Sequence, residues 1–148
     1  MMTRQMVLLA CICVSLAGCG GPKSARGFSL PDGDKTRGQE LFVELSCHEC
    51  HSISGVELPA LDDPAETIVR LGGEVTRIKT YGELVTSIIN PSHKLAVGYQ
   101  RDQIADERES KMTNYNDVMT VDQLIDLVAL LQSRYTLKPF EPTIYPLY

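Results

Sequence analysis

The chain has 148 residues, of which 43% are hydrophobic and 6% aromatic, with no tryptophan. This length supports one hydrophobic core with appendages, and so few aromatic side chains leave room for a large flat apolar cofactor in that core. The formal net charge is -5, and the sequence has no stripe of lysine and arginine, which argues against a nucleic-acid partner. A partner protein with a positively charged surface is favoured instead.

The amino terminus has the pattern of a secretory signal. Arg4 is the only charged residue in this region, and the apolar run 6–17 is long enough for a signal but too short to span a bilayer. The following "LAGC", residues 16–19, resembles a bacterial lipobox, in which the cysteine is acylated and becomes the mature terminus. We therefore expect residues 1–18 to be a lipoprotein signal peptide and Cys19 to carry lipid. An ordinary signal cleaved nearby, with Cys19 incidental, is the alternative.

Residues 19–34 are rich in glycine and proline and lack helical or strand periodicity, which predicts a flexible tether. Acyl chains contribute about 0.8 kcal/mol for each buried methylene, so several of them anchor a protein stably. The expected location is the periplasmic side of a bacterial envelope. Gly20 lacks the aspartate that retains lipoproteins at the inner membrane in enteric bacteria, which favours the outer membrane.

Capping residues and apolar spacing predict three helices. Asp34 or Thr36 can cap the first, which carries apolar residues on one face and Gly38 as a gap for a close-packed helix. Capping-box spacing opens the second at Thr80 and the third at Thr120; the third continues to about residue 135. Residues 71–80, "LGGEVTRIKT", fit either a short hairpin or an extended loop.

The segment "CHECH", residues 47–51, places two thiols and two imidazoles, all groups that can bind a cofactor or a metal, in five consecutive positions. In an exported protein, Cys47, Cys50 and His51 satisfy Cys-x-x-Cys-His, the attachment sequence of c-type haem. About one helical turn separates the two thiols, which suits thioether bonds to two vinyl groups. His51 then becomes the proximal iron ligand, and His48 is a solvent-facing spacer.

Three other interpretations of this segment fit it less well. A zinc site lacks the usual distant second ligand pair. A thioredoxin-like redox pair requires a preceding strand and βαβ context, which are not visible in the sequence. A disulfide across two residues leaves His51 unexplained.

Three stretches together resemble the monohaem, class I cytochrome c family: "RGQELFVELSCHECH", "YGELVTSIINPSHKLAVGY" and "KMTNYNDVMTVDQLIDLVALLQSRY". The last two are similar to the small cytochrome domains of terminal oxidases and related respiratory modules. The resemblance implies an all-α cytochrome c fold over residues 35–136. Three to five helices would wrap around one covalently bound haem c, and the first and last helices would cross.

The second iron ligand is expected to be Met112, because its flexible thioether lies in a polar loop before the last helix, where the family places its axial methionine. Met119 is the alternative, although its position just before the last helix suits a core residue. His93 is a third candidate for the second iron ligand. Thr113 replaces the proline that commonly follows the ligand in the family, and the polar insert 100–111 is a further departure.

The resemblance also implies a role for Pro59. The family places a proline after the haem sequence, and its carbonyl accepts the Nδ1 proton of the proximal histidine, which orients the ring. "VELPAL", residues 56–61, fits that place.

A haem held by histidine and methionine suits electron transfer, because a filled coordination shell leaves no position for substrate. The sequence shows no competing catalytic motif, so we expect a single-electron carrier and not an enzyme. Its partners would be a dehydrogenase donor and an acceptor such as a terminal oxidase. The alternatives are the electron-accepting haem subunit of a periplasmic oxidoreductase, for example one acting on sulfur compounds, and a haem sensor. The Pro- and aromatic-rich tail, residues 137–148, is expected to pack on the domain or on a partner.

Overall fold

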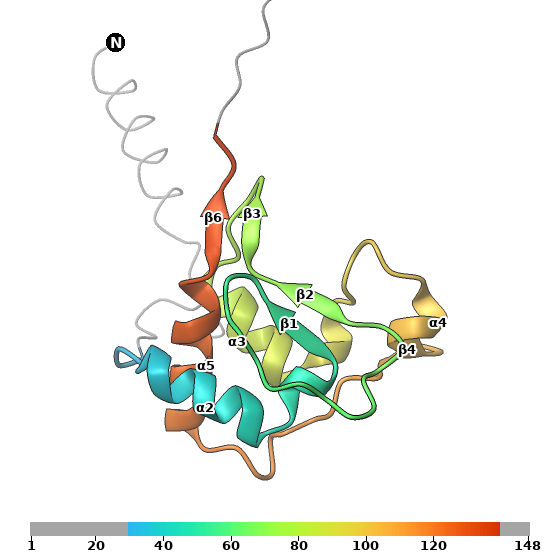
Figure 1. Ribbon diagram of the computed structural model, residues 1–148, viewed down its shortest axis with the longest axis horizontal. Helices are drawn as coiled ribbons and strands as arrows, with labels where there is room; N and C mark the ends of the chain where they lie inside the picture. The colour runs from blue at the N-terminus through green and yellow to red at the C-terminus, as the bar shows by residue number, and fades with distance from the viewer. Residues whose placement is uncertain (1–29, 140–148) are drawn as a thin grey trace, which may run out of the picture. The chain divides into compact units, whose positions relative to one another are not determined.

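The computed structural model describes residues 30–139. The predictions for the signal peptide 1–18, for Cys19 and for most of the tether therefore lie outside the described residues, as does the tail from residue 140. Figure 1 shows the arrangement of the described elements. In chain order they are α2 (Lys35–Glu44), the 3-10 turn η1 (Cys47–Glu49), β1 (His51–Ile53), β2 (Val69–Leu71), β3 (Gly73–Val75), α3 (Tyr81–Ile89), the 3-10 turn η2 (Pro91–His93), α4 (Arg101–Ile104), β4 (Ala105–Asp106), β5 (Glu109–Ser110), α5 (Val121–Gln132) and β6 (Tyr135–Leu137).

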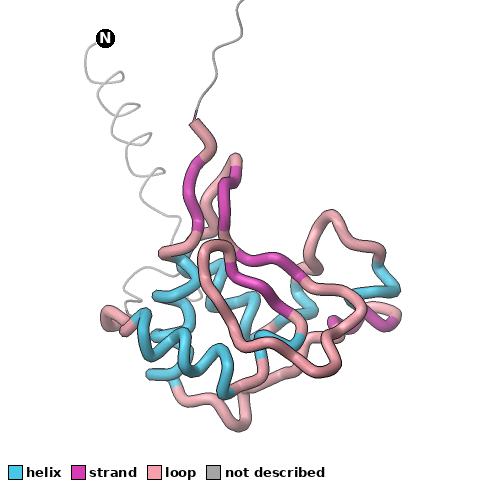
Figure 2. The backbone as a smooth tube through the Cα atoms, viewed as in Figure 1, coloured by secondary structure: helices cyan, strands magenta, loops and turns pink. Residues whose placement is uncertain are grey.

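The prediction of an all-α fold is wrong, because the chain is mixed α/β. Within residues 30–139, short strands in two-stranded sheets lie between the helices (Figure 2). Strands β1 and β2 pair in parallel, β3 and β6 pair in parallel, and β4 and β5 pair antiparallel. Each strand has only two or three residues, so no alternation of apolar and polar positions marks it in the sequence.

Residues 71–80 do not form the hairpin that was one of the two predictions for this segment. Gly73 instead begins β3, which pairs with β6 so that Gly73 lies beside Tyr135. Gly72 permits this approach: its φ is 77°, and a Cβ on it would lie 2.9 Å from the main-chain oxygen of Arg134. Helix α5 consequently ends at Gln132, and Tyr135 belongs to a strand and not to the last helical turn.

The predicted helix starts are confirmed. The carboxylate of Asp34 accepts the N–H groups of Thr36 and Arg37 at the start of α2. Thr80 opens α3 and Thr120 opens α5, each with the reciprocal hydrogen bonds of a capping box. A cap depends on residues two or three positions apart, so the sequence alone is enough to predict it.

Helix α2 packs against α5, as Figure 1 shows. Gly38 lies against the α5 main chain at Asp126, which confirms the predicted close approach. The buried Asp126 carboxylate accepts the Asp34 N–H at 2.8 Å and lies 3.3 Å from Arg37 Nε, so the start of α2 is tied to α5.

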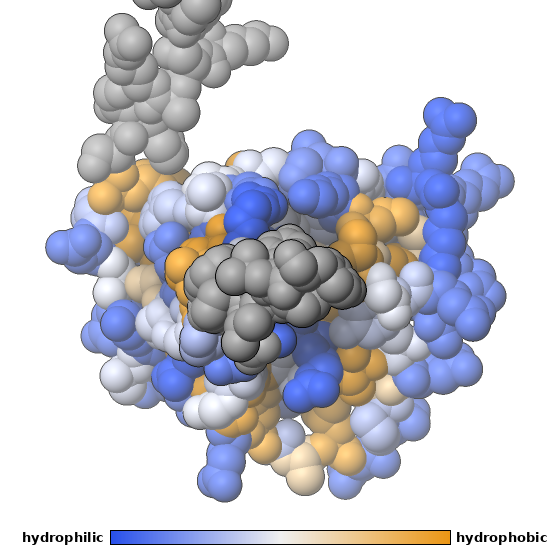
Figure 3. Space-filling view, turned by 90° about the horizontal axis from the view of Figure 1, so that it is seen from above, coloured by the Kyte–Doolittle hydropathy of each residue, from blue (hydrophilic) through white to orange (hydrophobic). Residues whose placement is uncertain are grey.

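The hydrophobic core lies between α2, α3 and α5. It consists of Leu41, Phe42, Ile53, Leu84, Ile88, Leu124, Leu127, Val128, Leu130 and Leu131. On the face seen in Figure 3, hydrophobic residues form separate patches among hydrophilic ones. Within residues 30–139, no helix is both long and apolar enough to cross a membrane.

Candidate cofactor-binding site

An apolar cavity reaches from the end of α2 into the core. Its volume is about 110 Å³. Pockets for organic ligands usually measure about 300–1,000 Å³, so a large cofactor fits only if the wall residues move apart or part of the cofactor lies outside the cavity. The lining residues are Phe42, Leu45, Cys47, His51, Leu71, Lys79, Leu84, Ser87, Ile88, Met112, Tyr115, Met119, Leu127, Leu131 and Tyr135.

The turn η1 presents the two cysteines. Ser46, with a φ of 55°, redirects the chain after α2, and the Cys50 N–H donates to the Cys47 carbonyl at 3.3 Å. Cys50 is the residue after the turn, and unlike Cys47 it is not among the residues that line the cavity. Both are free thiols; Cys47 is half-buried in the cavity wall and Cys50 is exposed.

Strand β2 orients His51. The Nδ1 atom of His51 lies 3.2 Å from the Val69 carbonyl oxygen, and the Val69 N–H donates to the Cys50 carbonyl at 2.8 Å. When Nδ1–H donates to Val69, the lone pair of the imidazole is at Nε2, which has no hydrogen-bond partner among residues 30–139. Burial lowers the pKa of His51, against a smaller opposing effect of the Val69 hydrogen bond. The ring is therefore neutral near pH 7, which is the form that binds metals.

Pro59 does not have the position that the sequence suggested. It is exposed in the loop after β1, and Val69 takes its place as the hydrogen-bond partner of His51 Nδ1. The parallel pairing of β1 with β2 sets His51 opposite Val69. Sequence reasoning missed Val69 because a main-chain carbonyl carries no residue-type signal.

The three candidates for the second iron ligand, here called the distal ligand, divide into two groups. Met112 and Met119 both line the cavity, and Met119 also packs against the buried core. His93 is exposed, and its Nδ1 lies 2.8 Å from the Asn90 carbonyl oxygen. The fold thus brings Cys47, His51 and both methionines to one cavity and leaves His93 outside it.

Two further polar residues contribute to the wall. Tyr115 Oη donates to the Leu45 carbonyl at 2.6 Å, which connects the segment containing Met112 to the end of α2. Lys79 supplies a positive charge to an otherwise mainly apolar lining among the described residues. No sequence pattern indicated Lys79.

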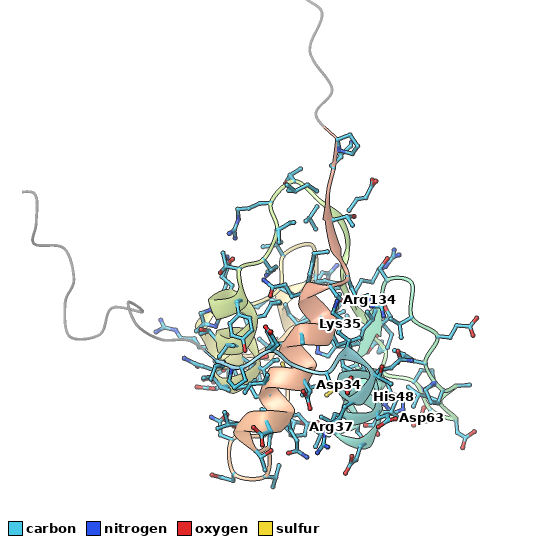
Figure 4. The ribbon with its side chains drawn as sticks, turned by 90° about the vertical axis from the view of Figure 1, so that its left-hand side faces the viewer. Asp34, Lys35, Arg37, His48, Asp63 and Arg134 are labelled. Atoms are coloured by element: carbon cyan, nitrogen blue, oxygen red, sulfur yellow. The ribbon has the colours of Figure 1, made fainter. Side chains whose placement is uncertain are left out.

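His48 differs from its predicted role as a solvent-facing spacer. It does not line the cavity, but its side chain is half-buried on η1 (Figure 4). Its Nδ1 atom is buried and has no hydrogen-bond partner in the part of the chain that the structure describes.

A wider hollow of about 710 Å³ lies at α4 and the β4–β5 hairpin. It is lined by exposed, charged side chains: Arg101, Asp106, Glu107, Arg108 and Glu109. It contains no thiol, imidazole or thioether, so its chemistry does not match the predicted site. Among the described residues, no three His, Cys, Asp or Glu side chains converge as a zinc site requires.

We predict that the two cysteines differ in reactivity in the cofactor-free chain. Burial raises the pKa of Cys47 to about 11, so its reactive thiolate is scarce at pH 8, whereas Cys50 is exposed. Iodoacetamide should modify Cys50 at least about tenfold faster than Cys47 at pH 8. The Cys47 rate should rise steeply as the pH increases toward 11. Tandem mass spectrometry of the peptide containing both residues measures the two rates, and equal rates at pH 8 would contradict the prediction.

Comparisons of the chain with protein-family models, with curated proteins and with solved structures found no match.

Proposed function

We propose that this protein is a c-type electron carrier that holds one covalent haem and is anchored by lipid on Cys19 at the periplasmic side of a bacterial membrane. The observation that carries the proposal is that Cys47, His51, Met112 and Met119, which the sequence singles out for haem binding, line one apolar cavity. Comparisons with known proteins contribute nothing to it.

The chemistry of the donor set suits the proposed group. Cys47 in the cavity wall and the exposed Cys50 would supply the two thiols for thioether bonds, and His51 would supply a neutral Nε2 that Val69 orients through Nδ1. A thioether from Met112 would complete the shell. When bound, the haem supplies one-electron redox chemistry at an iron whose potential is raised by histidine–methionine ligation.

The rest of the wall is mainly apolar. Leu71, Leu84, Ile88, Leu127 and Leu131 contribute to it from several elements, and apolar surroundings tune the potential of a metal centre. The proposed partners are a dehydrogenase as donor and an oxidase or similar protein as acceptor.

The proposal is tested on the full chain produced in a host with cytochrome c maturation. We expect the denatured protein to retain the mass of one haem, and a redox titration of the folded protein to follow a one-electron curve. A colourless product without the added mass would refute the proposal. Tight copurification with a catalytic subunit would instead favour the alternative role as the electron-accepting subunit of an oxidoreductase.

Substitution of the two cavity methionines identifies the distal ligand. We predict that M112L abolishes the near-infrared charge-transfer band of methionine-bound ferric haem, permits carbon monoxide binding to the ferrous form, and lowers the potential by on the order of 0.1 V or more. M119L is the matched control, because leucine preserves its packing against the core. The reverse pattern would assign the ligand to Met119, and no change in either variant would support a haem sensor with an open position.

A further inference from the structure

The segment 112–119 is fastened at two points on different helices. Tyr115 Oη donates to the carbonyl of Leu45, the C-cap of α2, at 2.6 Å. The next residue, Asn116, donates from Nδ2 to the carbonyl of Ile89, the last residue of α3, at 2.8 Å. Carbonyl groups at helix C-termini lack intrahelical partners, so both contacts satisfy acceptors that would otherwise need water.

Tyr115 also makes main-chain hydrogen bonds within the segment. Its main-chain oxygen accepts the N–H groups of Val118 at 3.1 Å and Met119 at 2.8 Å, which forms a turn. Its ring lines the cavity together with Cys47 and Met112. Displacement of Tyr115 would therefore move the turn that carries Met119 and disturb the cavity wall that Tyr115 shares with Met112.

The hydroxyl of Tyr115 is suited to a permanent hydrogen bond. Burial, and secondarily the neighbouring Cys47, raise the pKa of Tyr115 above its ordinary value, so it remains a proton donor across the physiological range.

We propose that Tyr115 is a positioning residue. Its hydrogen bond to Leu45 holds segment 112–119 against α2, and it thereby controls access to the cavity and keeps Met112 in the cavity wall. The access part concerns the chain alone. The part that concerns an iron ligand rests on the proposed function.

The first arm of the test uses the cofactor-free full chain. We expect Y115F to speed the alkylation of Cys47 about five- to tenfold and to leave the alkylation rate of Cys50 unchanged. This factor corresponds to the net free energy that one hydrogen bond contributes. Y99F is the matched control, because the Tyr99 hydroxyl also binds a main-chain group, the Arg70 N–H at 2.9 Å, but does not line the cavity.

Rates measured at several low denaturant concentrations separate local opening from global unfolding, since local opening depends little on denaturant. If Y115F is too unstable for this measurement, N116A removes the second anchor and should also expose Cys47. A Cys47 rate in Y115F equal to that of Y99F would overturn the proposal, as would an increase that only global unfolding explains.

The second arm uses the haem-loaded ferric protein. We expect imidazole to bind Y115F about five- to tenfold more tightly than the wild type, with a weakened near-infrared band, and Y99F to behave as wild type. Equal imidazole affinities in all three proteins would overturn the role in holding Met112. A colourless wild-type protein would refute the proposed function, while the alkylation arm would still decide the role of Tyr115.

Discussion

The double variant C47S/C50S is expected to lose covalent haem completely, whereas the wild-type chain is expected to retain one haem after denaturation. Serine has nearly the size of cysteine, but its hydroxyl does not form the thioether bonds that the proposed attachment requires. Cys50 is exposed and Cys47 is half-buried at the cavity, so we expect the fold around η1 to tolerate the change. Mass spectrometry and absorbance of the denatured proteins measure the attached haem.

Each single variant should retain one thioether and therefore some attached haem. C19S is the control for the loss of a cysteine elsewhere: we expect it to keep covalent haem and to leave the membrane fraction, because it lacks only the proposed lipid attachment. Haem that remains covalently bound in C47S/C50S would contradict the proposed attachment. C19S that stays in the membrane fraction would contradict the proposed anchor.

The substitution G38A is expected to destabilise the fold by about 1–3 kcal/mol, although alanine favours helix over glycine by about 1 kcal/mol. A Cβ at position 38 would overlap the main-chain oxygen of Asp126 and lie 3.0 Å from Leu130 Cβ. Main-chain atoms of α5 cannot rotate away, so α2 must move and disturb both the core and the contacts of Asp126. Chemical denaturation measures the free energy of unfolding.

Gly82 provides the matched control on another helix. It lies in the first turn of α3, and a Cβ there would have no neighbour within 4 Å. We therefore expect G82A to be neutral or to stabilise the protein by up to about 1 kcal/mol. G38A and G82A should change the free energy of unfolding in opposite directions, which distinguishes an effect of helix packing from one of helix propensity. A G38A protein as stable as the wild type would show that α2 and α5 do not pack as closely as the structure places them.

The helices and their starts could be predicted from the sequence. The caps at Asp34, Thr80 and Thr120 depend on neighbours two or three residues away, and the spacing of apolar residues marks the faces that pack. The strands could not be predicted in this way. Three residues are too few to show a period, and β6, the partner of β3, lies far along the chain near the end of the described residues.

The candidate site divides in the same way. The positions of Cys47, Cys50 and His51 follow from a local motif, and the sequence also identified Met112 and Met119. Strand pairing brought Val69 to His51 in place of Pro59, because the register of a parallel pair is a property of two distant segments.

By itself the sequence determined which side chains are candidates for binding a cofactor, and where the helices begin, because both depend on residues close together in the chain. Only the tertiary structure decided which of these side chains share a cavity, which carbonyl orients His51, and that Tyr115 fastens the Met112 segment to α2. Those contacts join segments far apart in sequence through main-chain groups that every residue carries, and packing of the whole chain selects among them.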